Sequence, residues 1–220
     1  AQWVLGYSPY RKSGKKWLDR MIGYETFHTA FLYFGEAAAG RPWMGVGRNI
    51  AYHKSWFEAQ KGFAKHHDKL SGDDDLLIAH ASTNETVEMS PPALLIANDT
   101  WVDTDAPQSW REWVQQKRRH VGASVAYPLR IQMRLAVYFL SFVAIYGLIL
   151  AAILSFSLSL PHIVIFMAYS YAKWKALRFA AWQLEFRSPI LRWMIDETLL
   201  LSYCLFLVPL GWLQAAPRWK

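Results

Sequence analysis

Hydrophobic and polar positions divide the chain into two parts that meet near residue 129. In the first part apolar residues are spaced as in helices and short strands, whereas the second part consists mainly of long apolar runs. Four aromatic side chains recur at the period of one helix face, which predicts a helix over 17–39. This face suits either ordinary core packing or a helix lying at a membrane interface. The four residues are Tyr24, Phe27, Phe31 and Phe34.

Short apolar runs bounded by glycine, proline or polar residues predict the remaining elements of the first part. Because the chain begins with a strand-like run and not with Met, we expect that a preceding portion of the fold is absent from it. Strands are expected at 2–7, 50–52, 86–89 and 93–97, helices at 55–63, from 73 onwards and at 110–120, loops at 11–16 and 64–71, and a turn at 103–105.

The second part contains a long stretch without a charged residue, from 135 to 172. As a single straight helix it would be about 57 Å long, nearly twice the ~30 Å hydrocarbon core of a bilayer. Two antiparallel spans fit better, at 135–154 and 156–172, with the turn at 155–161. A further apolar segment, 198–216, predicts a third span.

Positive charge and tryptophan flank the predicted spans. Arg130 and Arg134 precede the first span, and a basic segment at 173–196 follows the second, which predicts that both lie at the cytoplasmic face. Within this interfacial segment Ser188 and Pro189 predict the start of a helix. Its basic residues are Lys173, Lys175, Arg178, Arg187 and Arg192.

These patterns predict an α/β domain over 1–128 and a region of transmembrane helices over 129–220. The net charge of +7 is compatible with nucleic acid, anionic lipid or phosphorylated substrates. Because much of the Lys and Arg lies close to apolar runs, lipid and phosphate are favoured over nucleic acid. Cys204 is the single cysteine, so an intrachain disulfide is excluded. The scarcity of ionisable residues in the spans argues against a transporter.

Three adjacent carboxylates, Asp73, Asp74 and Asp75, open a predicted helix. Carboxylates are favourable at a helix N-terminus, but a third one adds repulsion that a cap does not require. Crowded carboxylates also raise one another's pKa, which suits a general base. His66 and His67 lack further ligands at suitable spacing, so no metal site is predicted in the chain.

Two further motifs are candidates for ligand binding. Gly45 and Gly47, with an arginine and an asparagine beside them, indicate a backbone that something approaches closely, although the segment lacks a complete nucleotide fingerprint. The predicted helix at 110–120 is the most basic and aromatic short run in the chain. Arginine suits phosphate by its charge and its planar geometry.

The chain contains, in order, the motifs Gly45-x-Gly-Arg-Asn-x-Ala-Tyr52, Gly72-Asp-Asp-Asp-Leu76 and Gln116-Lys-Arg-Arg-His120, followed by the predicted membrane hairpin. This arrangement resembles the C-terminal half of membrane-bound family 2 glycosyltransferases. These inverting GT-A enzymes are related to the cellulose, hyaluronan and poly-N-acetylglucosamine synthases, and the resemblance is nearest to bacterial members. It implies the C-terminal part of a GT-A domain with interfacial helices, followed by a multi-pass helical region in the bacterial inner membrane, with the active site on the cytoplasmic side.

The resemblance also implies roles for the charged residues of these motifs. Asp73 corresponds to the base that deprotonates the acceptor hydroxyl, with Asp74 as the alternative. Gln116 and Arg119 correspond to residues that contact the donor diphosphate on a helix at the membrane surface. An arginine at this place would stabilise the charge that builds up on the leaving nucleotide.

By the same resemblance, Gly47, Asn49 and His120 would line the acceptor site. His120 stands where the family usually has tryptophan. A stacking platform for a sugar ring is therefore lost, which argues against processive extension of a long polymer. The helix at 17–39 would correspond to the interfacial helix of the family.

The implied reaction transfers a sugar from a nucleotide-sugar donor to a glycan or a lipid-linked acceptor. The donor-binding half of the family, with its metal-binding Asp-x-Asp, has no counterpart in the sequence. We therefore expect a fragment or one part of a split enzyme, inactive alone, whose Mg²⁺ or Mn²⁺ ion is held by a separate donor-binding portion. The alternative is a non-catalytic membrane anchor or partner subunit in which the acidic and basic motifs pair structurally.

Overall fold

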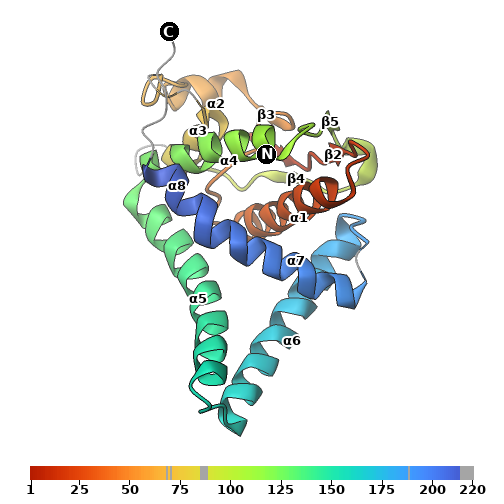
Figure 1. Ribbon diagram of the computed structural model, residues 1–220. Helices are drawn as coiled ribbons and strands as arrows, with labels where there is room; N and C mark the ends of the chain where they lie inside the picture. Colours follow the sequence, from red (N-terminus) through yellow and green to blue (C-terminus); the bar gives the residue numbers. More distant parts are fainter. Residues whose placement is uncertain (68, 70, 85–88, 188, 214–220) are drawn as a thin grey trace.

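The computed structural model describes residues 1–67, 69, 71–84, 89–187 and 189–213. It is mainly helical, with a small mixed sheet and a pair of long helices that extend away from the sheet (Figure 1). The expected α/β class is met only loosely, since helices dominate the strand-containing part as well.

β1 (Trp3–Gly6) is the central strand of a three-stranded sheet. It pairs antiparallel with β3 (Ile50–Tyr52) and parallel with β4 (Ala93–Leu95), at three of the predicted positions. Trp3 and Leu5 are fully buried, so the alternation of side chains along a strand places one face of β1 in the core.

A second sheet joins β2 (Tyr10–Arg11) and β5 (Thr104–Asp105) in parallel. Arg11 belongs to a predicted loop, and β5 replaces most of the predicted turn at 103–105. Strands of two residues carry no periodic pattern, so the sequence offers no signal for them. The Nε atom of Arg11 donates to Oδ1 of Asp105 at 2.8 Å and ties the two strands together.

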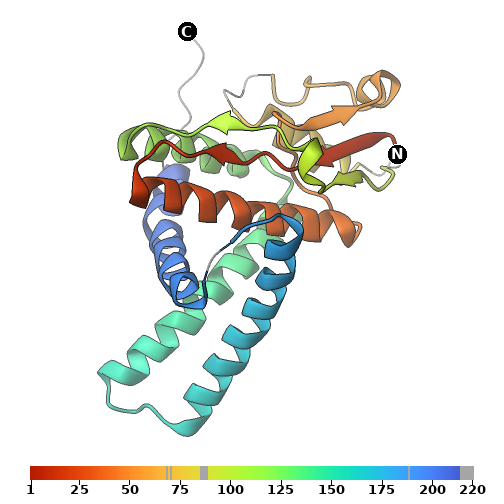
Figure 2. The ribbon, with the colours of Figure 1, turned by 90° about the vertical axis from the view of Figure 1, so that its right-hand side faces the viewer.

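The longest helix of the first part, α1 (Lys16–Ala38), lies between the sheet and the long helices of the second part of the chain (Figure 2). Tyr24, Phe27 and Phe34 are buried, and Phe31 packs against the same core. Residues on the other faces of α1 are buried as well. Core packing therefore explains the aromatic face predicted for this helix.

Two short helices flank a polar segment, α2 (Lys54–Ala59) and α3 (Asp73–Ala81). The predicted helix at 55–63 ends early because Lys61 and Gly62 adopt positive φ angles, which lie outside the helical region. The helix predicted from 73 onwards begins at that residue.

The basic helix is α4 (Trp110–Ala123), and it begins where the sequence predicts. The hydroxyl of Ser109 accepts the backbone N–H of Glu112 at 3.2 Å, which caps the first turn. A 3-10 turn, η2 (Ser124–Ala126), ends the helix, and another, η1 (Asn98–Thr100), lies between β4 and β5.

α5 (Leu129–Leu154) and α6 (Leu160–Gln183) form a hairpin whose tip points away from the sheet (Figure 1). Both helices extend beyond the predicted spans into the flanking basic residues. Pro161 lies in the first turn of α6, where its missing N–H has no helical partner to lose. The connection is therefore limited to 155–159.

Two helical stretches among the described residues are long and apolar enough to cross a membrane, by length and composition. One is the whole of α5, and the other is Arg192–Gly211. α6 is not one of them, and its second half carries Lys173, Lys175 and Arg178.

The last helical stretch starts earlier than the predicted span at 198–216. It consists of α7 (Ile190–Ser202), a π-helical turn η3 (Tyr203–Leu207) and α8 (Val208–Leu213). The π turn ends two residues before Pro209, which has no N–H for the normal hydrogen bond to the turn before it. Outside the described residues lie Ser188, 214–216 and most of the predicted strand at 86–89.

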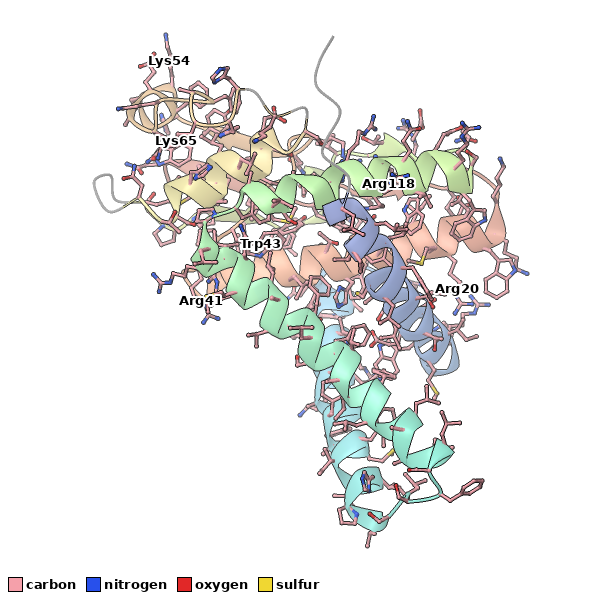
Figure 3. All side chains as sticks on the ribbon, turned by 60° about the vertical axis from the view of Figure 1, so that its left-hand side comes forward. Arg20, Arg41, Trp43, Lys54, Lys65 and Arg118 are labelled. Atoms are coloured by element: carbon pink, nitrogen blue, oxygen red, sulfur yellow. The ribbon has the colours of Figure 1, made fainter. Side chains whose placement is uncertain are left out.

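Two acidic residues of α7, Asp196 and Glu197, are buried among the helices. Arg20 of α1, which Figure 3 shows next to α7, pairs with Asp196 through Nε and Oδ1 at 2.5 Å. Nζ of Lys173 lies 2.5 Å from Oε2 of Glu197, and the hydroxyl of Tyr24 donates to Oε1. The sequence predicted that Lys173 lies in the interfacial segment. Its side chain is instead buried, and Glu197 compensates its charge in the interior.

Replacing Glu197 by leucine should strongly destabilise the packing of the helices, because the buried ammonium of Lys173 would lose its counter-ion. Breaking one side of a buried pair typically costs about 3–5 kcal/mol. The melting temperature of the purified protein in detergent measures the effect. The double variant Lys173→Met/Glu197→Leu should recover much of the loss, and Lys54→Ala, at a side chain that is 88% exposed, should change nothing. A double variant as unstable as the sum of its single changes would contradict this account.

Candidate functional site

A cavity of about 580 Å³ lies where the loop at 44–48, the first turn of α3 and the middle of α4 meet β2 and β5. Three motifs that are far apart in the sequence therefore face one cavity. Six of the seven predicted site residues line it: Gly47, Asp73, Asp74, Gln116, Arg119 and His120.

The acidic side of the cavity is the start of α3. Gly72 has a φ angle of 85°, and a Cβ atom there would lie 2.6 Å from the Cβ of Ala123 in α4, so this turn requires glycine. The three aspartates follow in the first turn, where the helix dipole favours negative charge. Asp73 is exposed and has no hydrogen-bond or ion-pair partner among the described residues.

Asp74 and Asp75, in contrast, are engaged by the protein. Oδ2 of Asp74 accepts the backbone N–H of Gly47 at 2.5 Å, and Oδ2 of Asp75 accepts the hydroxyl of Tyr127 at 3.2 Å. Burial raises the pKa of both carboxyls, and that of Asp75 well above its ordinary value, where the charge of Asp74 adds to the effect. The uncharged form of Asp75 is therefore favoured.

The glycine loop packs closely against this acidic turn. A Cβ atom at Gly47 would lie 2.8 Å from Oδ2 of Asp74, so a side chain there would displace the carboxylate. Nδ2 of Asn49 donates to the carbonyl oxygens of Tyr7 at 2.7 Å and Thr100 at 2.9 Å. Asn49 thus fixes the loop from behind, and it is not among the residues that line the cavity.

α4 forms the basic side of the cavity. Gln116, Arg119 and His120 are three and four residues apart, which places them on one face of the helix. Nε2 of Gln116 donates to the hydroxyl of Tyr10 at 3.0 Å. Arg119 is exposed, and within the described part of the chain it has no hydrogen-bond or ion-pair partner.

His120 lies among positive charges. Desolvation, and then the charges of Lys117, Arg119 and Arg48, lower the pKa of its imidazole to about 3. His120 is therefore neutral at pH 7 and offers hydrogen bonding but no charge. Lys117 forms a buried ion pair with Glu25 of α1. Arg48 and Arg119 are thus cations of the cavity wall without an ion pair among the described residues.

Sequence reasoning assigned no role to Tyr10, Arg48 or Glu25, which also line the cavity. The guanidinium of Arg48 lies over the ring of Tyr10, 4.3 Å from its centroid. Tyr10 is therefore shared between Arg48 and Gln116. Arg48 was visible as part of the glycine motif, but Tyr10 is 106 residues from Gln116 and carries no local signal.

The divalent cation implied by the resemblance has no ligand set in this cavity. Over the described residues, no group of three or more His, Cys, Asp or Glu side chains is placed to hold a metal ion. Asp74, Asp75 and Glu25 each already bond to another group of the protein. The described residues therefore offer no metal site made of protein side chains alone.

A larger cavity, of about 800 Å³, lies between α1, the end of α6 and the start of α7. Aromatic side chains dominate its lining, among them Trp174, Trp182 and Trp193. None of the predicted site residues lines it. We place the candidate site in the smaller cavity, where groups of opposite charge face each other.

No protein-family model, curated protein or solved structure matches the chain. The resemblance to family 2 glycosyltransferases therefore rests on its motifs, which meet in the smaller cavity. The chemistry of that cavity follows from two unpartnered groups of the described chain, the carboxylate of Asp73 and the guanidinium of Arg119.

Replacing Asp75 by asparagine should stabilise the protein at neutral pH. The pKa of Asp75 is raised in the folded state, so its contribution to stability is fully present below the unfolded pKa, about 3.9, and is lost as the pH rises through the folded pKa. Asparagine cannot ionise, so it does not lose this contribution. In denaturant titrations, the free energy of unfolding of Asp75→Asn should exceed that of the wild type at pH 8 and approach it at pH 4.

The matched control for this prediction is Asp99→Asn, at an exposed aspartate, which should shift stability equally at both pH values. An Asp75→Asn variant whose advantage over the wild type is larger at pH 4 than at pH 8 would show that the carboxylate is stabilised, and not penalised, by its surroundings.

Proposed function

We propose that the chain is the acceptor-side and membrane portion of an inverting family 2 glycosyltransferase of the bacterial inner membrane. One observation carries the proposal: Asp73 and Arg119 line the same cavity, and neither has an ion-pair partner in the described chain. Such a cavity favours a ligand that has a proton to give up and negative charge to bind. An acceptor hydroxyl and a nucleotide-sugar diphosphate together have these properties.

In the proposed reaction Asp73 takes the proton of the acceptor hydroxyl while that oxygen attacks the anomeric carbon of the donor sugar. The bond from this carbon to the diphosphate oxygen breaks in the same step, and the oxygen leaves with the electron pair. A single displacement inverts the anomeric configuration. Gln116 and Arg119 bind the diphosphate, and the guanidinium stabilises the negative charge that grows on the leaving group.

Asp73 is favoured over Asp74 as the base. The carboxylate of Asp74 is held by the backbone N–H of Gly47, which occupies one of its oxygens. Asp73 is exposed to the cavity and has no such bond among the described residues. Asp74 remains the alternative, since burial raises its pKa, a common property of bases that work near neutral pH.

The proposed acceptor is a glycan or a lipid-linked glycan that reaches the cavity beside Gly47 and His120. The exposed glycine lets an acceptor approach the backbone closely. The neutral imidazole of His120 supplies a hydrogen bond but less stacking surface than a tryptophan. The smaller stacking surface of His120 supports a reaction that transfers one or a few sugars over one that extends a long polymer processively. The nucleoside and its metal would be held by a separate donor-binding portion.

The non-catalytic alternative, an anchor or partner subunit, predicts that the acidic and basic motifs pair with each other. Instead, Lys117 of the basic motif pairs with Glu25 of α1, and in the described chain Asp73 and Arg119 form no ion pair. The charges of Asp73 and Arg119 remain available to a ligand, which favours the enzyme over the anchor. A loss of assembly without a loss of donor affinity in Gln116→Ala and Arg119→Ala would favour the anchor.

The membrane location is part of the same proposal. α5 is long and apolar enough to span a bilayer, and it directs large apolar side chains outwards, for example Val137 and Leu140, each 67% exposed. An apolar surface of this kind suits a lipid environment better than water. The basic residues near the start of α5, Arg130 and Arg134, support a cytoplasmic position for the cavity.

In the intact enzyme, Asp73→Asn should slow sugar transfer by about 10²–10⁴-fold, the usual contribution of a general base. Affinity for the nucleoside diphosphate should stay unchanged, because the proposed diphosphate contacts lie on α4. Transfer to an added acceptor gives the rate, and calorimetry gives the affinity. Asp74→Asn is the matched variant and should lose less activity. Transfer by Asp73→Asn at nearly the wild-type rate, with nucleotide binding intact, would show that the base is assigned wrongly.

Cysteine labelling should establish the topology. Phe156 at the tip of the α5–α6 hairpin is 96% exposed, and Lys54 lies at the other end of the molecule (Figure 3). In spheroplasts, Phe156→Cys should react with a membrane-impermeant maleimide, whereas Lys54→Cys should react only after lysis. Cys204 is buried and gives the background in the wild type. Labelling of Phe156→Cys only after lysis would rule out a hairpin that crosses from the cytoplasm.

A further inference from the structure

Arg48 is a half-buried cation of the cavity wall that the proposed reaction leaves unused. Two contacts hold its side chain. The guanidinium lies over the ring of Tyr10, and Nη2 donates to the carbonyl oxygen of Ser8 at 3.1 Å. Neither contact supplies a negative charge, so the charge of Arg48 is oriented but not neutralised.

One nitrogen of the guanidinium of Arg48 is buried and unsatisfied. Nη1 is buried and has no hydrogen-bond partner within the described chain, and no carboxylate there forms an ion pair with Arg48. Removing a guanidinium from water without a counter-ion is costly. Lys117, a cation of α4 that also lines the cavity, differs from Arg48, because Glu25 neutralises its charge. Arg48 as a whole is only half-buried and lines the cavity, so an anion bound in the cavity would compensate its charge.

Arg48 belongs to the same part of the cavity as the residues expected to bind the diphosphate. Tyr10 contacts Arg48 through its ring and Gln116 through its hydroxyl. The charges of Arg48 and Arg119 both act on the imidazole of His120. Two guanidinium groups from different elements, the glycine loop and α4, are thus available in one cavity.

Building on the proposed function, we infer that Arg48 is a second diphosphate-binding residue, and that Arg48 and Arg119 each bind one phosphate group of the nucleotide-sugar. A diphosphate carries charge on both phosphates, and a guanidinium binds a phosphate through two parallel hydrogen bonds. Two cations therefore match the two phosphates better than Arg119 alone. Tyr10 is a positioning residue, which keeps Arg48 next to Gln116.

A phosphate on a lipid-linked acceptor has the same chemistry as the donor diphosphate. The contact of Tyr10 with both Arg48 and Gln116 favours the donor, because Gln116 is one of the proposed diphosphate ligands. Comparison of inorganic pyrophosphate with a polyprenyl phosphate separates the two sources, since the first presents a diphosphate without a lipid and the second a single phosphate on a lipid.

The test uses the full-length protein in nanodiscs of neutral phosphatidylcholine and calorimetric titration with pyrophosphate and phosphate. Arg48→Met should weaken pyrophosphate binding by about ten- to a hundredfold, the range expected for a charge-assisted contact. The loss for phosphate should be smaller, because one phosphate group needs only one guanidinium. Arg41→Met removes the same charge at an exposed arginine outside the cavity, labelled in Figure 3, and should alter neither affinity.

Unchanged pyrophosphate affinity in Arg48→Met, together with a loss in Arg119→Met, would overturn the role of Arg48 and leave the proposed function standing. Unchanged affinity in both variants would overturn both, since the cavity would then bind no diphosphate. Weaker binding of a polyprenyl phosphate in the nanodisc, with pyrophosphate affinity intact, would overturn the present assignment in favour of the acceptor. If Arg48→Met melts early, Arg48→Lys replaces it, and a loss no larger than that of Arg41→Lys would refute the proposal.

Discussion

The ion pair between Lys117 of α4 and Glu25 of α1 is the interaction on which the candidate site depends most. Both side chains are almost completely buried, at 10% and 6% exposure. Trp113, one helical turn before Lys117, is buried on the same face and packs with residues of α1. Because this face must point to α1, the face that carries Gln116 and Arg119 turns towards the cavity. The orientation of the basic residues is thus set by the burial of their neighbours.

α1 connects this arrangement to the rest of the protein. Besides the bond from Glu25 to α4, the hydroxyl of Tyr33 donates to the carbonyl of Gly6 in β1 at 3.2 Å, and Tyr24 donates to Glu197 in α7. The sheet, the basic helix and the candidate membrane helices are therefore held by one helix (Figure 2). Under the proposed function, such a connection keeps the proposed base and the proposed diphosphate-binding residues at a fixed distance from the bilayer.

Features with a local signal could be predicted from the sequence. The aromatic period of α1, the start of α4 at Trp110 and the uncharged stretch of α5 and α6 each depend on residues close together in the chain. The meeting of the glycine, acidic and basic motifs followed from the resemblance, and the cavity brings these motifs together. The resemblance also implied that Asn49 lines the acceptor site, but its amide instead bonds to two backbone carbonyls and does not line the cavity.

Contacts between residues that are distant in the chain had no local signal in the sequence. Lys173 has the sequence surroundings of an interfacial lysine, and only the packing of α6 against α7 brings it to Glu197. The contact from Tyr10 to Gln116 and the pairing of β2 with β5 likewise depend on tertiary structure. Each of these pairings satisfies polar groups, and that of Lys173 with Glu197 does so in the interior, a requirement that appears only once the elements are packed.

The central claim is that the cavity between α3 and α4 binds the diphosphate of a nucleotide-sugar. A structure of the full-length protein with a bound nucleoside diphosphate tests it most directly. The account predicts that the phosphates lie in this cavity, within hydrogen-bond distance of Arg119 and across from Asp73. A nucleotide bound with its phosphates outside the cavity, while Arg119 and Asp73 face only solvent, would contradict it.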